Sequence, residues 1–92
     1  MFNIKDALYV SKILGIQFDK FTLDDFLLGL NIELEHGLIN PKTNVTNNDL
    51  ILTAKIALAH LEEFPNYYNS VYGLTNFEKI NIKLKKYITL YL

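Results

Sequence analysis

"TLDDFLLGLNIELEHG", residues 22–37, decides the fold because it has the features of one complete amphipathic helix. Thr22 and Asp25 stand three positions apart, the capping-box spacing that begins helices, and Gly37 is a residue type at which helices end. Apolar residues recur between them at intervals of three and four, namely Leu23, Phe26, Leu27, Leu30 and Leu34. This periodicity predicts a helix with one buried face over residues 22–37.

Similar signals predict a helix on each side of this stretch. Upstream, Asn3 caps a helix that carries an acid three positions later at Asp6 and ends at Gly15. Downstream, a helix begins after Thr46, again with an acid three positions later at Asp49, and runs through "NNDLILTAKIALAHLEEF". If it forms a simple hairpin with the helix at 22–37, the two helices pack antiparallel.

The remaining third of the chain predicts two more helices. Pro65 ends the third helix and suits the start of a short fourth one, "PNYYNSVY", which stops at Gly73. A capping box then precedes an amphipathic C-terminal extension helix over residues 76–92. Alternating apolar residues in that extension leave a strand as the alternative. The sequence therefore predicts one all-α domain, residues 1–92, built as a small bundle of about five helices.

The amino-acid composition argues against several classes of protein function for this chain. The chain has 92 residues, half of them hydrophobic and none of them cysteine, so packing alone must hold the fold together. Its nine cationic residues are all lysine, and the absence of arginine argues against sequence-specific nucleic-acid recognition. No signal peptide and no apolar run of membrane-spanning length are evident. We therefore expect a soluble protein that is not secreted through a signal peptide and does not bind membranes.

Two acid–histidine pairs are the most unusual polar feature. Glu33 and His36 share the apolar stripe of their helix, and His60 and Glu63 have the same spacing on the next helix. Glu35 sits beside the first pair but points sideways. We interpret these five residues as a structural polar network that satisfies backbone groups of the neighbouring loops.

A metal site is the alternative role for Glu33, His36, His60 and Glu63, because paired Glu and His ligands occur in di-iron helical bundles. Such a site needs its ligands around one centre, and a simple hairpin would separate the two pairs, whereas a crossing connection would bring them together. No nucleophile with a positioned base, phosphate-binding glycine loop or zinc-protease motif is evident. The expected protein is therefore not an enzyme and has no cofactor.

Several segments together resemble an uncharacterised domain family of bacterial and tailed-phage genomes. They are "ELEHG" at 33–37, "NVT" at 44–46, "KIALAHL" at 55–61 and "PxYY" at 65–68, and the resemblance covers about residues 8–72. The C-terminal extension lies outside this pattern. The family has no assigned activity, but the resemblance implies a small phage-encoded or phage-associated protein, located in the virion or the host cytoplasm.

These observations favour a non-enzymatic structural or protein-interaction component, a virion or assembly accessory protein whose partners are other copies or virion proteins. A metal-binding helical protein that uses the Glu/His pairs is one alternative, and a phage-encoded inhibitor of a host protein is another. Tyrosines are the interface candidates, since their rings can be buried while the hydroxyl stays wet, although the same rings could close the core. They are Tyr67, Tyr68, Tyr72, Tyr87 and Tyr91.

Overall fold

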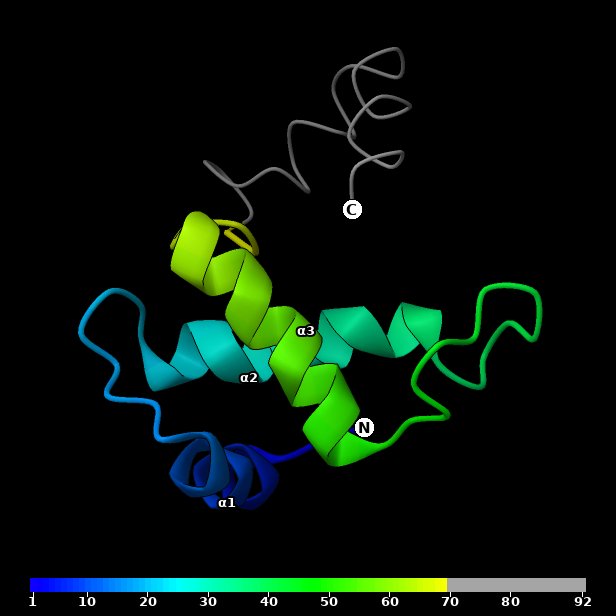
Figure 1. Ribbon diagram of the computed structural model, residues 1–92, viewed down its shortest axis with the longest axis horizontal. Helices are drawn as coiled ribbons and strands as arrows, with labels where there is room; N and C mark the ends of the chain where they lie inside the picture. The colour runs from blue at the N-terminus through cyan, green and yellow to red at the C-terminus, as the bar shows by residue number, and fades with distance from the viewer. Residues whose placement is uncertain (70–92) are drawn as a thin grey trace, which may run out of the picture.

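The computed structural model of the protein describes residues 1–69. They form helix α1 (Ile4–Leu14), helix α2 (Leu23–Ile32), the 3-10 helix η1 (Glu33–His36) and helix α3 (Leu50–Glu63). Figure 1 shows α2 across the middle of the molecule, with α3 crossing it and α1 below. This confirms the all-α prediction with three α-helices in residues 1–69, in which no strand occurs. The expected helix at 76–92 lies outside the described residues.

Reciprocal capping boxes begin the first two helices, as the sequence predicts. In α1 the Asn3 side chain accepts from the Asp6 amide at 3.0 Å, and the Asp6 carboxyl group accepts from the Asn3 amide at 2.9 Å. Thr22 and Asp25 make the same pair of bonds at the start of α2, both at 3.0 Å. Each cap satisfies amides that the helix itself leaves without partners, so these starts are encoded locally.

The start of α3 differs from the prediction. Asp49, rather than Thr46, is the N-cap, and its side chain accepts from the Leu52 amide at 2.9 Å. Asn47 and Asn48 have φ angles of 52° and 60°, and such left-handed conformations cannot continue a right-handed helix. The helix therefore begins one turn later than expected.

At the other end of α2, the last turn tightens into η1, and Gly37 ends the helix as predicted. The reason for glycine here is space, since a Cβ atom at this position would collide with the side-chain oxygen of Asn48. That oxygen also accepts a hydrogen bond from the Leu38 amide at 2.9 Å. Gly37 thus lets the returning loop pack directly against the end of the helix.

The predicted helix after Pro65 is wrong for residues 65–69, and residues 70–73 lie outside the described part of the chain. Two successive turns form instead, with the Tyr67 amide bonded to the Phe64 carbonyl and the Asn69 amide to the Asn66 carbonyl, both at 2.9 Å. Tyr67 and Tyr68 are both buried. Neighbouring side chains on a helix point about 100° apart, so turns suit the burial of two adjacent rings better.

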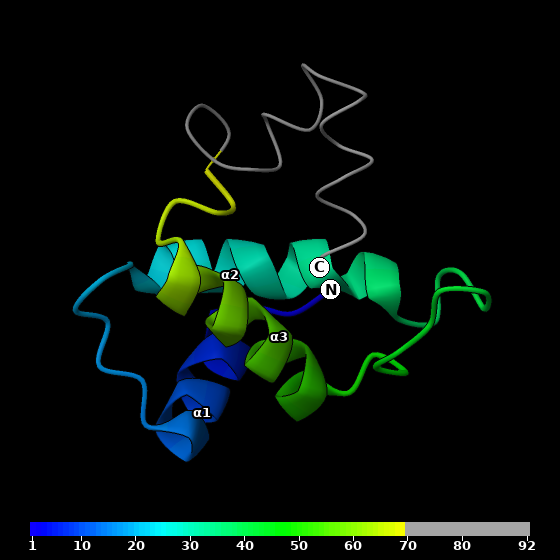
Figure 2. The same ribbon diagram turned by 45° about the horizontal axis from the view of Figure 1, so that its top comes forward.

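The core lies where the three helices meet (Figure 2). Fully buried side chains come from every helix, namely Ala7, Val10, Phe26, Leu30, Ala54, Ala57 and Leu61. Alanines on α1 and α3 allow close approach of the helix backbones, while Phe26 and Leu30 of α2 fill the centre. None of the helices within residues 1–69 has the length and apolar character needed to cross a membrane.

Candidate functional site

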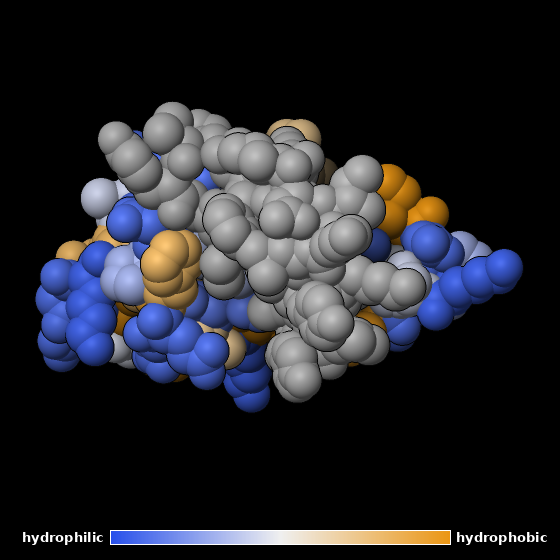
Figure 3. All heavy atoms as spheres, turned by 90° about the horizontal axis from the view of Figure 1, so that it is seen from above, coloured by the Kyte–Doolittle hydropathy of each residue, from blue (hydrophilic) through white to orange (hydrophobic). Residues whose placement is uncertain are grey.

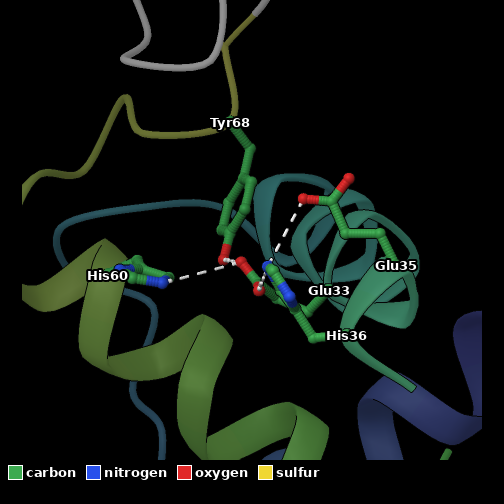
Figure 4. A network of polar contacts seen from close by, with 5 residues as sticks. All are labelled: Glu33, Glu35, His36, His60 and Tyr68. Carbon is green, nitrogen blue, oxygen red and sulfur yellow. Dashed lines mark hydrogen bonds and ion pairs between the residues drawn. The ribbon is translucent and has the colours of Figure 1, made fainter. Parts of the chain in front are cut away.

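Glu33 stands at the centre of the polar cluster (Figure 4). It begins η1 directly after α2 and is only 4% exposed. The Tyr68 hydroxyl donates a 2.5 Å hydrogen bond to Glu33 Oε2. This bond joins residues 35 positions apart in the sequence, so it fastens the turn that follows α3 to the end of α2.

Gly29 explains how Tyr68 reaches this position. A Cβ atom at residue 29 would lie 2.5 Å from Cε2 of the Tyr68 ring, closer than any packed side chain tolerates. The ring therefore lies directly on the α2 backbone, and its hydroxyl extends to Glu33, which is one helical turn further on. Glycine destabilises a helix interior, and here it provides the close approach that the ring requires.

His60 contributes to the cluster from α3. Its Nε2 atom lies 3.7 Å from Glu33 Oε2, and its side chain is 16% exposed. The imidazole also stacks on the Tyr67 ring, with centroids 4.3 Å apart and planes 4° from parallel. The two tyrosines meet edge to face at 4.8 Å. His60, Tyr67, Tyr68 and Glu33 thus form one packed unit, which we call the Glu33 junction.

His36 lies at the edge of the junction rather than inside it. Its side chain is 47% exposed, with Nε2 at 3.9 Å from Glu33 Oε1 and 3.5 Å from the exposed Glu35 carboxyl group. The backbone of His36 has the closer structural role. Its carbonyl oxygen accepts from the amides of Val45 and Thr46 at 2.7 Å and 3.3 Å, which holds the returning loop to the helix end.

Glu63 differs most from the sequence-based expectation. It is the last residue of α3, it is exposed, and within residues 1–69 no hydrogen bond or ion pair joins it to the Glu33 junction. The neighbouring Glu62 is exposed as well. The structure therefore brings together Glu33, His36, Glu35 and His60 but leaves Glu63 outside.

His60 approaches Glu33 because α3 crosses α2 (Figures 1 and 2). A simple antiparallel hairpin would have placed His60 far from Glu33, and the thirteen-residue connection from Gly37 to Asp49 permits the crossing instead. Even so, no group of three or more His, Asp or Glu side chains within residues 1–69 is placed to hold a metal ion.

Electrostatics explain the direction of the central hydrogen bond. Burial raises the pKa of the Tyr68 hydroxyl far above its ordinary value, and the negative charge of Glu33 raises the pKa further. Tyr68 consequently keeps its proton and acts as the donor. The sequence predicts Tyr68 only as an interface candidate and does not predict its bond to Glu33. The available signal was Gly29, a glycine inside a helical pattern that marks close approach.

The sequence predicts that the tyrosines either form an interface or close the core. Tyr67 and Tyr68 are only 5% and 2% exposed, so these two belong to the core. The other interface candidates, Tyr72, Tyr87 and Tyr91, lie outside the described residues.

Residues 7–86 match a family described as proteins of unknown function, DUF5661. The chain belongs to this family. The match to DUF5661 continues past residue 72, where the sequence resemblance was expected to end, so much of the C-terminal extension is a family feature. Comparison with curated proteins and with solved structures finds no match.

Proposed function

We infer that this member of DUF5661 is a non-enzymatic structural or protein-interaction component, an accessory protein of a phage virion or of its assembly. The observation that carries the proposal is a set of exposed apolar side chains on the loop between η1 and α3. Leu38, Ile39 and Val45 are 60%, 80% and 70% exposed. Exposed apolar groups that are close in sequence and held on one loop favour contact with another protein.

This loop, residues 37–49, is tied by its own hydrogen bonds. The Thr43 amide donates to the Asn40 carbonyl at 3.2 Å, and the Lys42 amide donates to the Asn40 side chain at 3.0 Å. Asn44 and Asn47 are joined twice, at 2.6 Å and 2.8 Å. A loop ordered before binding loses less conformational entropy on contact, which supports a binding role for the apolar side chains.

The Glu33 junction supports the non-enzymatic part of the proposal. Its carboxyl group accepts the Tyr68 hydrogen bond inside the fold, and the His60 ring is stacked on Tyr67. Groups engaged in this way hold three segments of the chain together. Their polar character is accounted for by packing, without any substrate.

Incorporation into particles tests the proposal. Particles produced from the genome that encodes the chain are purified and probed for it, with the wild type and Ile39→Asp compared. We expect wild-type chain in the particles and a reduced amount of the variant, because the substitution places a charge in the exposed apolar set. Tyr9→Asp, at an exposed apolar position on α1, is the control. Wild-type particles that lack the chain would contradict an accessory role.

A further inference from the structure

The end of the molecule opposite the apolar loop carries a half-open hollow of about 420 Å³. It lies beside residues 15–21, which connect α1 to α2, and part of α3 closes one side. Its apolar walls include Ile16, Phe18, Phe21 and Leu58. Pockets of about 300–1,000 Å³ commonly hold small groups, so this hollow suits one or two side chains rather than a helix.

Phe18 fixes one wall of the hollow in an uncommon backbone conformation. Its φ angle is 54°, in the left-handed region that a bulky residue rarely adopts. Its ring packs edge to face against Phe21 and Phe26, with centroids 5.8 Å and 6.0 Å away. Because Phe26 is fully buried in the core, these contacts hold the wall in place before anything enters the hollow.

The apolar loop and the hollow flank opposite ends of α2. Figures 1 and 2 show residues 15–22 at one end of the long axis and residues 37–49 at the other. Figure 3 shows an orange hydrophobic patch at the loop end of the face in view, beside a hydrophilic tip. One copy therefore cannot fill its own hollow with its own loop, whereas two copies placed end to end can do so.

We propose that the chain self-associates head to tail, with Leu38 and Ile39 of one copy entering the hollow of the next. This inference rests on the proposed assembly role and names a second copy as the partner. Such a contact is heterologous, so it propagates into a ring or an open filament rather than stopping at a dimer.

Charge complementarity supports this partner. Lys42 is exposed, and it is the only charged residue in the part of the loop that carries the exposed apolar side chains, while Asp49 at the end of the loop caps α3. Asp19, Lys20 and Glu62 line the hollow, which gives the lining one net negative charge. Because the apolar part of the loop carries the positive charge of Lys42, docking at the negative lining of the next copy gains attraction and orientation.

Mixing two defective variants of the full-length chain tests the arrangement. Ile39→Asp disables the loop and leaves the hollow intact, whereas Gln17→Trp fills the hollow and leaves the loop intact. Gln17 is exposed and lines the hollow, so both changes avoid the core. Tyr9→Asp is the control for adding a charge at an exposed apolar site. Analytical ultracentrifugation over a range of concentrations measures the size of the assemblies, and circular dichroism checks that each variant is folded.

We expect the wild type and Tyr9→Asp to form assemblies that grow with concentration. Ile39→Asp alone and Gln17→Trp alone should each associate at least about tenfold more weakly than the wild type, because each lacks one side of a buried interface contact. Their mixture should form a 1:1 complex that grows no further, because one intact loop and one intact hollow remain. A strictly monomeric wild type would overturn the inference, as would unchanged association of either variant or a mixture that fails to pair.

The outcome is separable from that of the proposed function. A wild-type chain that is monomeric in isolation but present in particles would overturn head-to-tail self-association and leave the accessory role standing. A chain that assembles end to end but is absent from particles would support the self-association and contradict the accessory role.

Discussion

The pairs Glu33–His36 and His60–Glu63 have the same residue types and the same spacing, but the fold places their glutamates in opposite environments. Glu33 is buried and bonded to Tyr68, while Glu63 is exposed at the end of α3. The difference arises because the end of α2 lies under α3 and the turn that follows it, whereas α3 stops at Glu63. Local spacing predicts which side chains share a helix face, and the helix crossing decides which of them become buried.

Truncation of the two glutamates gives the sharpest contrast and the largest expected effect. Glu33→Ala leaves the buried Tyr68 hydroxyl without an acceptor and should lower the free energy of unfolding by about 3 kcal/mol. Glu63→Ala, at an exposed position, should change it by no more than about 0.5 kcal/mol. Urea denaturation followed by circular dichroism measures both values. Equal losses for the two variants would remove the distinction.

Gly29→Ala tests the buried Glu33 environment by changing how Tyr68 packs on α2. The added methyl group meets the Tyr68 ring at 2.5 Å and should displace it from Glu33, at a cost of about 2 kcal/mol in unfolding free energy. Alanine is otherwise the better helix former, so a chain without the Tyr68 contact would gain stability from this change. Thermal unfolding of Gly29→Ala therefore distinguishes a close ring contact from an ordinary helix position by the sign of the effect.

Alkaline pH should weaken the junction specifically. The pKa of Tyr68 is raised in the folded state, so its contribution to stability is complete below its ordinary pKa of about 10 and declines as pH rises above that value. The wild type should lose about 1.4 kcal/mol of unfolding free energy per pH unit from this group. Tyr68→Phe should lack that component, whereas Tyr9→Phe, at an exposed tyrosine, should keep it. Identical alkaline slopes for the wild type and Tyr68→Phe would contradict the assignment.

Substitution of the two histidines should give the smallest difference in unfolding free energy. His60→Ala removes a ring that is stacked on Tyr67 and should cost about 1 kcal/mol of unfolding free energy. His36→Ala should cost no more than about 0.5 kcal/mol, because the side chain is half exposed and its carbonyl still holds the loop. Thermal melts of both variants check the order, and a larger loss for His36→Ala would reverse the placement of these residues.

The sequence predicted the features that neighbouring residues determine. Asn3 with Asp6 and Thr22 with Asp25 cap α1 and α2 through contacts three residues apart, so no tertiary information was needed. The start of α3 was misplaced even though a local signal existed. Asn47 and Asn48 are of a residue type that adopts positive φ more readily than most residues other than glycine, and they delay the helix to Asp49.

The Glu33 junction could be predicted only in part. Periodicity placed Glu33 on a buried stripe, but its approach to His60 depends on how α3 crosses α2, which spacing within one helix does not specify. The Tyr68 bond depends on turns at residues 65–69 that replace the expected helix. Contacts between residues 35 positions apart arise from packing of the whole fold, and Gly29 was their one local sign.

A double-mutant cycle on Glu33 and Tyr68 tests most directly whether the cluster is a structural junction. The free energies of unfolding of the wild type, Glu33→Ala, Tyr68→Phe and the double variant give the coupling between the two side chains. A buried hydrogen bond that involves a charged group predicts a coupling of about 1.5–3 kcal/mol, so the double variant should be little worse than Glu33→Ala alone. Losses that add to within about 0.5 kcal/mol would contradict the junction, because they would mean that the two residues stabilise the fold independently.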